Sequence, residues 1–181
     1  MIPYRANHNS KTMPGNPLPD AEQLLKALIE QMRPAVGPET GLIGIHTGGV
    51  WVAERLHQAF NLKVPLAALD VSFYRDDYQS RGLHPDVQRS EIPFEVEERH
   101  LVLVDDVLYT GRTIRAALNE IFDYGRPGRV QLAALLDRGG RQLPIEADFI
   151  GATAQLPPGK SVELTRDAKG RLSFVLHEEK P

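Results

Sequence analysis

Two acidic residues and a Thr-Gly-x-Thr group stand close together after an apolar run of the chain. Asp105 and Asp106 follow residues 101–104, and residues 110–113 read Thr-Gly-Arg-Thr directly before a helical pattern. The first backbone N–H groups of a helix lack internal partners and carry a partial positive charge, so an anion such as a phosphate fits there. Gly111 lets the backbone approach that anion closely. The spacing therefore predicts a phosphate site at the start of a helix.

The acidic pair predicts a sugar next to that phosphate. Asp105 and Asp106 would repel a phosphate in direct contact, so we expect them a short distance away, as acceptors for hydroxyl groups. A ribose 5-phosphate offers a phosphate at one end and two adjacent hydroxyls on its ring, and the carboxylates also favour a cationic sugar transition state. The alternative is a solvated turn in which the pair caps the helix. The apolar run before the pair and the Thr-Gly-x-Thr group after it argue against that alternative.

Other phosphate-binding and metal-binding patterns do not occur in the sequence. Gly111 is followed by Arg112 and Thr113 rather than by the Lys and Ser/Thr of a Walker A motif, and no Gly-x-Gly-x-x-Gly follows an apolar run. A phospho-acceptor receiver domain would not need the Thr-Gly-x-Thr group. The chain has no cysteine and its histidines lack the spacing of metal ligands, so we predict no metal site made of protein ligands alone.

Alternating strand and helix patterns must position these residues. Helical patterns begin after Asp20, after residues 46–49 and after residue 113, and Pro34 and Gly125 end the first and the last. Short apolar runs predict strands at 41–45, 65–73, 101–104, 130–136 and 149–150, and a hairpin joins 161–164 to 172–176. This order predicts an α/β fold with a doubly wound, mostly parallel sheet. We expect one domain over residues 20–181 after a loose tail at 1–19.

Four loops are expected around one crevice, because ligands of such sheets bind beyond the carboxyl ends of the strands. These loops are residues 46–49, 74–98, 105–113 and 137–140. Residues 74–98 are polar, lack periodicity and are long for a loop within a domain, which predicts a flexible loop or hairpin over the site. Its Arg-Asp-Asp stretch, residues 75–77, is either part of such a lid or a solvated turn.

Composition and charge exclude several classes of protein. The formal net charge of −3 gives no overall basic excess for nucleic acid. No apolar run approaches the roughly 18 residues that span a bilayer, and residues 1–19 lack an apolar signal core. We therefore expect a cytoplasmic protein with no membrane partner.

Residues 101–113 resemble the 5-phosphoribosyl pyrophosphate (PRPP) signature of type I phosphoribosyltransferases. The stretch Val-Asp-Asp-Val-Leu-Tyr-Thr-Gly-Arg-Thr at 104–113 is similar to that of the PyrR family, whose members are pyrimidine-operon regulators with uracil phosphoribosyltransferase activity. Residues 44–50, 69–77 and 137–144 resemble further loops of that family. The resemblance covers roughly residues 40–151.

The resemblance implies a role for each matching residue. Asp105 and Asp106 would be catalytic and hold the ribose hydroxyls, and Asp137 and Arg138 would lie near the base. The residues that bind PRPP and the product UMP would be Thr47, Gly48, Gly49, Arg75, Val107, Leu108, Tyr109, Thr110, Gly111, Arg112 and Thr113. Uracil would be the acceptor, and Mg²⁺ would be held mainly by substrate oxygens and water. The family also implies a homo-oligomer.

Tyr109 favours a pyrimidine acceptor over a purine. Many purine-using relatives carry an acidic residue at this position, where it can act as a base toward a purine nitrogen. A phenol ordinarily keeps its proton near neutral pH. Two other functions stay open: a phosphoribosyltransferase for hypoxanthine or guanine, and a nucleotide-sensing regulator that binds RNA and has little catalytic activity.

Two departures from the family pattern concern charge. The first loop usually carries Thr-Arg-Gly, and here Gly48 replaces the arginine, so one cation facing the pyrophosphate is missing. In the regulatory relatives the first helix and the segment after the later loop are basic. Here that helix has only Lys26, and Glu146 and Ala152 stand where basic residues are common. Since RNA affinity depends largely on Lys and Arg contacts to phosphates, we expect little positive charge for RNA beyond Arg138 and Arg141.

Overall fold

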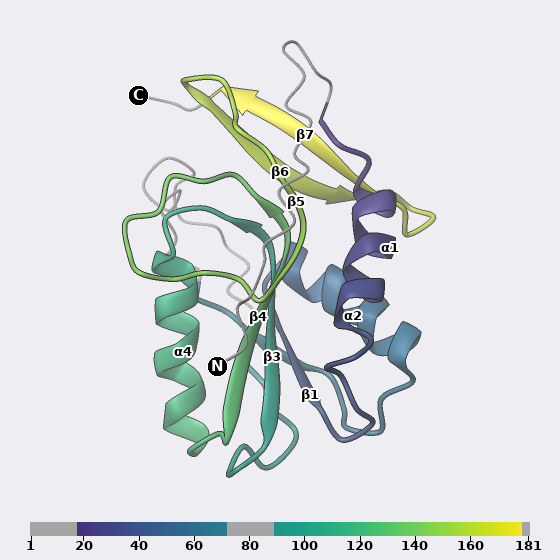
Figure 1. Ribbon diagram of the computed structural model, residues 1–181, viewed down its shortest axis with the longest axis vertical. Coiled ribbons are helices and arrows are strands. Elements are labelled where there is room, and N and C mark those ends of the chain that lie inside the picture. The colour runs from purple at the N-terminus through teal and green to yellow at the C-terminus, as the bar shows by residue number, and fades with distance from the viewer. Residues whose placement is uncertain (1–17, 72–88, 179–181) are drawn as a thin grey trace, which may run out of the picture.

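A five-stranded parallel sheet forms the centre of the molecule in the computed structural model, which describes residues 18–71 and 89–178. The strands lie in the order β2-β1-β3-β4-β5. Their bounds are β1 Gly41–Ile45, β2 Ala67–Leu69, β3 His100–Leu108, β4 Arg129–Asp137 and β5 Phe149–Thr153. The helices are α1 Ala21–Met32, α2 Gly48–Phe60 and α4 Arg112–Tyr124. The predicted α/β fold with a parallel sheet is confirmed (Figure 1).

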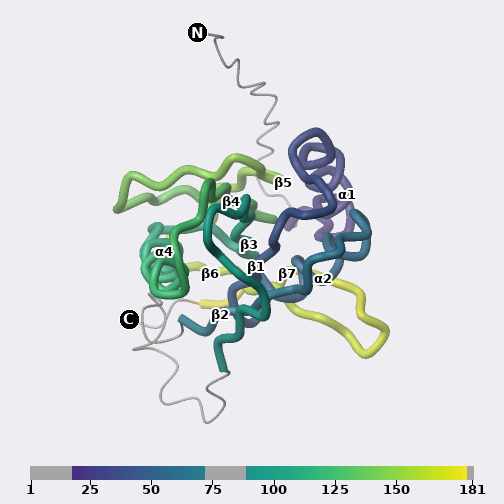
Figure 2. The backbone as a smooth tube through the Cα atoms, turned by 90° about the horizontal axis from the view of Figure 1, so that it is seen from below, coloured from purple at the N-terminus to yellow at the C-terminus, as the bar shows by residue number. Residues whose placement is uncertain are grey.

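Helices cover both faces of the sheet, and each face has its own core. Figure 2 shows α4 on one side of the strands and α1 and α2 on the other. Val102 and Val104 of β3 pack toward α1 and α2, whereas Leu101 and Leu103 pack toward α4. Since successive side chains of a strand point to opposite faces, a strand covered on both sides must be apolar at every position. This requirement explains the continuous apolar run that predicted β3.

The predicted helix ends are confirmed where the capping residues are visible. The side chain of Asp20 accepts a hydrogen bond of 2.9 Å from the backbone N–H of Glu22 and so caps α1. Gly125 directly follows the last residue of α4, as expected for a glycine at a helix end. These local signals determine where the helices start and stop relative to the loops at the sheet edge.

Strand β3 extends four residues beyond the apolar run that predicted it. The predicted strand was 101–104, whereas β3 continues through Asp105, Asp106 and Val107 to Leu108. The reason is pairing with β4, in which Asp105 lies opposite Ala134 and Leu108 opposite Asp137. The acidic pair therefore lies within the strand rather than in a turn.

The second half of the predicted lid packs on the sheet. Backbone hydrogen bonds of 3.0 and 2.8 Å join Ala68 and Glu91 in an antiparallel bridge. Ile92, Phe94 and Val96 then pack against the core beneath α4. Residues 89–98 of the predicted loop at 74–98 are therefore attached to the sheet, with Val96 buried and Ile92 and Phe94 partly buried. Residues 74–88 lie outside the described residues, as do 1–17 of the predicted tail and the last part of the strand predicted at 65–73.

A two-stranded antiparallel hairpin lies above the carboxyl ends of the sheet (Figure 1). Its strands are β6 Lys160–Arg166 and β7 Leu172–Glu178, which confirms the predicted hairpin. Leu164 and Leu172 enter the core beneath α1 and α2. Glu22 of α1 accepts the backbone N–H of Leu172 over 2.9 Å, so the hairpin is attached to the first helix.

None of the helices in the described ranges is long and apolar enough to cross a membrane.

Candidate functional site

A pair of buried carboxylates lies near the carboxyl end of β3. Asp105 is 5% exposed and Asp106 is 8% exposed, and the backbone N–H of Asp106 donates to Oδ1 of Asp105 over 3.0 Å. Val104 packs toward α2, so Asp106, two residues further, shares that face while Asp105 lies on the face of α4. Two adjacent buried carboxylates are costly to desolvate, which is typical of a functional site.

The loop that follows β3 leads directly into α4. We define the β3–α4 loop as residues 109–113. Gly111 caps the helix with φ of 92°, a left-handed conformation that glycine adopts without strain. Thr110 is 3% exposed, and its Oγ1 accepts the backbone N–H of Arg112 over 3.3 Å. This arrangement places a buried hydroxyl and the first backbone N–H groups of α4 beside the acidic pair.

The β1–α2 loop, residues 46–49, meets β3 on the other face of the sheet. Gly48 and Gly49 are buried at the start of α2. A Cβ at Gly48 would overlap with the carboxylate of Asp106, and a Cβ at Gly49 would lie 2.5 Å from the carbonyl oxygen of Val104. The absence of side chains at both glycines therefore allows the start of α2 to lie directly against the acidic pair.

The β4–β5 loop, residues 138–148, packs against the β3–α4 loop. The backbone N–H groups of Gln142 and Leu143 donate to the carbonyl oxygen of Thr110 over 3.0 and 3.2 Å. Arg112 donates from Nε to Oε1 of Gln142 over 3.0 Å. Ile145 lies beside Gly111, since a Cβ on that glycine would be 3.3 Å from the Cβ of Ile145. The β3–α4 loop thus has a support made of a segment that comes later in the chain.

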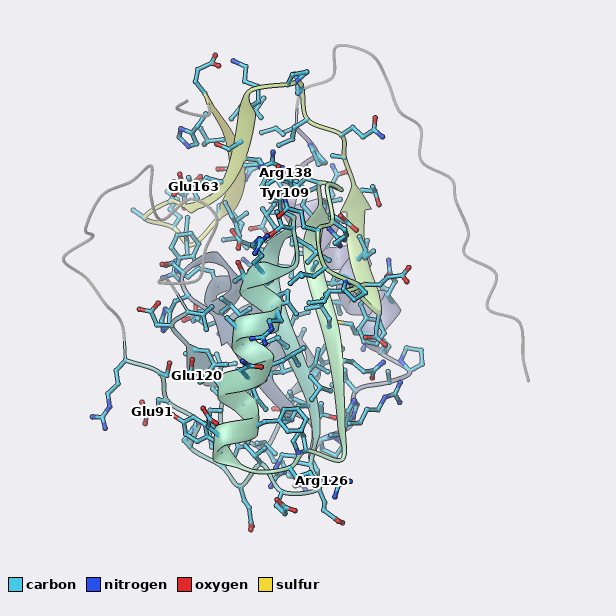
Figure 3. All side chains as sticks on the ribbon, turned by 90° about the vertical axis from the view of Figure 1, so that its left-hand side faces the viewer. Glu91, Tyr109, Glu120, Arg126, Arg138 and Glu163 are labelled. Atoms are coloured by element: carbon cyan, nitrogen blue, oxygen red, sulfur yellow. The ribbon has the colours of Figure 1, made fainter. Side chains whose placement is uncertain are left out.

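Arg138 and Tyr109 form a stack at the same edge. The guanidinium carbon of Arg138 lies 3.8 Å from the centre of the Tyr109 ring, a cation–π arrangement. Nη2 of Arg138 also donates to the carbonyl oxygen of Lys160 over 3.1 Å, which connects the stack to β6. Figure 3 shows the two side chains together at the upper end of α4, far from Arg126 at its lower end.

The structure brings the predicted residues in its described ranges to one edge of the sheet. Gly48 and Gly49 lie on one side of the acidic pair and the β3–α4 loop on the other, with Thr47 at the start of α2. Val107 and Leu108 end β3, where Leu108 lies opposite Asp137. Arg75 lies outside the described residues.

Sequence reasoning missed the contacts of Arg141. Its Nη2 donates to Oδ2 of Asp137 over 2.6 Å, its Nη1 to the carbonyl oxygen of Tyr109 over 2.5 Å, and its Nε to the carbonyl oxygen of Ile145 over 2.9 Å. The sequence contained one indication, because Arg141 follows Asp137 by four residues at the end of a predicted strand. The partner at Tyr109 is 32 residues away and cannot be read from local spacing.

The described residues contain no group of three His, Cys, Asp or Glu side chains that could enclose a metal ion. Carboxylate oxygens are nevertheless present at Asp105 and Asp106, and they are suitable partners for a hard cation or its water.

Comparison with known sequences finds similarity to phosphoribosyltransferases along most of the chain. The model of the phosphoribosyl transferase domain matches residues 17–158. A protein of Nitrosococcus oceani named bifunctional protein PyrR is 56% identical over 144 residues, covering 78% of this chain and 81% of that protein. A protein of the same name from Pseudomonas paraeruginosa is 51% identical over 156 residues, covering 83% and 91%.

Solved structures share the fold at much lower sequence identity. A hypoxanthine-guanine phosphoribosyltransferase from Bacillus anthracis superposes with a TM-score of 0.61 at 20% identity, over 80% of this chain and 85% of that one. The hypoxanthine phosphoribosyltransferase of Trypanosoma cruzi has a TM-score of 0.56 at 23% identity, over 75% and 79%. At these identities the likeness concerns the fold alone.

Proposed function

The chain belongs to the PyrR family of type I phosphoribosyltransferases, and on this premise we propose that it transfers the phosphoribosyl group of PRPP to uracil. The products are UMP and pyrophosphate. The observation that carries the proposal is the buried Asp105–Asp106 pair, with the β1–α2 loop against one face and the β3–α4 loop following it. A substrate with a phosphate, a ribose and a pyrophosphate has three parts that match these three elements.

The 5-phosphate binds at the β3–α4 loop. Gly111 gives close approach to the backbone, and the first N–H groups of α4 offer partial positive charge. The hydroxyls of Thr110 and Thr113 add donors, and two backbone N–H groups of the β4–β5 loop bond the carbonyl oxygen of Thr110. A phosphate bound there leaves the ribose hydroxyls beside the carboxylates of Asp105 and Asp106.

The carboxylates stabilise the transition state. As the bond between C1′ and the pyrophosphate oxygen breaks and the bond from C1′ to N1 of uracil forms, the sugar gains oxocarbenium character, as glycosyl transfers commonly do. Two fixed negative charges in a poorly solvated place favour that positive charge and need no rearrangement during the reaction. The N1 proton of uracil passes to the departing pyrophosphate or to water, which balances the step.

The leaving pyrophosphate lies against the β1–α2 loop. With glycine at 48 and 49, that loop offers backbone N–H groups rather than side-chain cations. Mg²⁺ bound to PRPP would supply the positive charge that neutralises the pyrophosphate, with substrate oxygens and water as its main ligands. Arg75 is a further candidate for this side of the site and stays a prediction.

The base lies near the Tyr109–Arg138 stack, which Arg138 joins to the hairpin through Lys160. Tyr109 offers no acidic group toward a purine nitrogen, which supports uracil as the acceptor. Asp137 and Arg138 follow β4 at the same edge, and Arg138 is fixed by Tyr109 and by the carbonyl oxygen of Lys160.

A second candidate function is regulation of pyrimidine genes through RNA, which is favoured by family membership and by the relatives' name, bifunctional protein PyrR. RNA would have to bind a surface other than the one that the sequence suggested around Arg138 and Arg141. Arg138 and Arg141 already bond within the chain, so neither guanidinium is directed to an external phosphate by the contacts described above. Binding to pyrimidine leader RNA that weakens steeply with salt would support this function.

The test is pyrophosphate release from PRPP and Mg²⁺ with uracil, hypoxanthine, guanine or orotate supplied separately. We expect turnover with uracil and little with the purines. Turnover with hypoxanthine or guanine instead would assign a purine phosphoribosyltransferase. Binding of PRPP without turnover of any base would contradict the enzymatic proposal and leave the regulatory one.

A further inference from the structure

Arg141 connects the two parts of the site that would hold the two ends of the product. Nη2 bonds Oδ2 of Asp137 on the base side, and Nη1 bonds the carbonyl oxygen of Tyr109, where the β3–α4 loop begins. Nε bonds the carbonyl oxygen of Ile145 and fixes the plane of the guanidinium. The planar fork of an arginine makes such contacts together, whereas the single ammonium of a lysine cannot reproduce their geometry.

The base-side partner of Arg141 is itself held in place. The other carboxylate oxygen of Asp137, Oδ1, accepts the backbone N–H of Gly139 over 2.9 Å. The side chains of Arg141 and Asp137 are only 23% and 13% exposed, so water screens their ion pair less than a surface pair. Removal of the arginine would leave a largely buried carboxylate with one partner fewer.

The phosphate-side partner, Tyr109, lies in the loop between the end of β3 and the start of α4. The ring of Tyr109 fills the space beside Gly140, where a Cβ would lie 2.5 Å from Cε2. Its carbonyl oxygen is the acceptor for Arg141, and the next carbonyl, of Thr110, accepts from the β4–β5 loop. Displacement of that loop would therefore move the residues that begin α4.

We propose that Arg141 is a positioning residue that couples the base side of the site to its 5-phosphate side. Through Arg141, the position of Asp137 and the position of the β3–α4 loop depend on each other. A base that orders Asp137 and Arg138 then favours the conformation of the β3–α4 loop that binds phosphate. By the same coupling, a bound phosphate raises the affinity for the base by the same factor. This inference rests on the proposed function for the identity of the ligands, but it is tested by binding and needs no turnover.

The variants are Arg141→Gln, which removes the charge and the fork, and Arg141→Lys, which keeps the charge but not the fork. The control is Arg33→Gln, which removes an ion-paired arginine at the exposed end of α1, away from the site. Calorimetry measures the dissociation constants of ribose 5-phosphate and of UMP, and thermal unfolding reports whether each variant is folded.

We expect both Arg141 variants to bind ribose 5-phosphate about tenfold more weakly than the unaltered protein, although Arg141 contacts only Asp137, Tyr109 and Ile145 in the bonds described. The affinity for UMP should fall more than the affinity for ribose 5-phosphate, because binding of the base of UMP no longer strengthens binding of its phosphate. Arg141→Lys should unfold close to the temperature of the unaltered protein, and Arg33→Gln should bind both ligands unchanged.

Unaltered affinity for both ligands in folded Arg141→Lys would overturn the proposal, because a purely structural arginine predicts that result. Equal losses for ribose 5-phosphate and UMP would also overturn it, because they show no coupling to the base. If the unaltered protein binds UMP but does not convert uracil, the proposed enzymatic function fails while the coupling is still measured. If it binds neither ligand, both proposals fail.

Discussion

The β1–α2 loop and the β3–α4 loop lie on the two sides of the same acidic pair but are built differently. In the β3–α4 loop, Thr110 and Arg112 take part in side-chain hydrogen bonds, and the β4–β5 loop supports them. In the β1–α2 loop, Gly48 and Gly49 fit against β3 with no side chain between. The β3–α4 loop can therefore be changed one bond at a time, whereas the β1–α2 loop depends on a close backbone fit. In the proposed function, this difference means that separate side-chain bonds would hold one end of the substrate and a close backbone fit would hold the other.

Replacing Asp105 and Asp106 together by Asn removes what the two loops share. We expect turnover to fall by at least about 100-fold, since loss of a preorganised electrostatic group typically costs that much. Steady-state pyrophosphate release is the measurement. Asp123→Asn, an exposed carboxylate on α4, is the control. Turnover within a factor of two of the unaltered protein would mean that the acidic pair has no catalytic role.

Gly48→Arg restores the family's usual cation to the β1–α2 loop and tests whether fit or charge matters there. We expect kcat/KM to fall about tenfold rather than rise, because the new Cβ would overlap with the carboxylate of Asp106 and overpacking of this kind costs about 1–3 kcal/mol. Gly37→Arg is the control, since a Cβ at Gly37 meets nothing within 4 Å. An increase in kcat/KM would show instead that the missing charge limits the enzyme.

Thr110→Val changes one bond of the β3–α4 loop and keeps its shape. The loss of Oγ1 leaves the backbone N–H of Arg112 without the 3.3 Å bond and removes a donor to phosphate. We expect ribose 5-phosphate to bind about fivefold more weakly, in line with roughly 1 kcal/mol for one hydrogen bond. Calorimetry gives the dissociation constant, and Thr165→Val on the hairpin provides the comparison. Unchanged affinity would place the phosphate elsewhere.

Glu22→Gln affects neither loop and tests the attachment of the hairpin. The Arg55 guanidinium, which bonds the carboxylate of Glu22, holds the pKa of that carboxyl below its usual 4.5. Because the folded-state pKa is the lower one, the stabilisation is present above pH 4.5 and is lost as pH falls through the folded value. At pH 7 we expect the substitution to lower the free energy of unfolding by about 1 kcal/mol.

The measurement for Glu22→Gln is urea unfolding as a function of pH. The difference from the unaltered protein should shrink as pH decreases below 4.5. Glu146→Gln, an exposed carboxylate of the β4–β5 loop, should show no such trend. A difference that stays constant down to the acid limit would indicate that shape rather than charge attaches the hairpin.

Local patterns predicted the elements, and long-range pairing determined what those patterns missed. The apolar run at 101–104 predicted the first part of β3. The prediction ended there because Asp105 and Asp106 are polar, and polar residues argue against a buried strand. Only the partner strand β4 shows that they belong to it. In the same way, Ile92, Phe94 and Val96 alternate over too short a stretch to outweigh their polar neighbours, and burial beneath α4 determines their place.

The candidate site was predictable to the extent that its residues are contiguous. Thr110, Gly111 and the acidic pair stand in one short stretch, so helix and strand rules and the family resemblance could place them. Arg141 contacts Tyr109 across 32 residues, and Arg138 contacts Lys160 across 22. Such contacts depend on how the loops pack, which hydrophobic periodicity does not describe.

The hydrogen bond between Glu22 and Leu172 has a consequence for the order in which parts of the protein fold during synthesis. The two residues are separated by 150 positions, so the hairpin cannot dock on α1 until the intervening chain has left the ribosome. The sheet and its helices can assemble earlier from nearer neighbours, such as β3 with β4. During synthesis, the carboxyl ends of the sheet strands can therefore form before the hairpin lies above them.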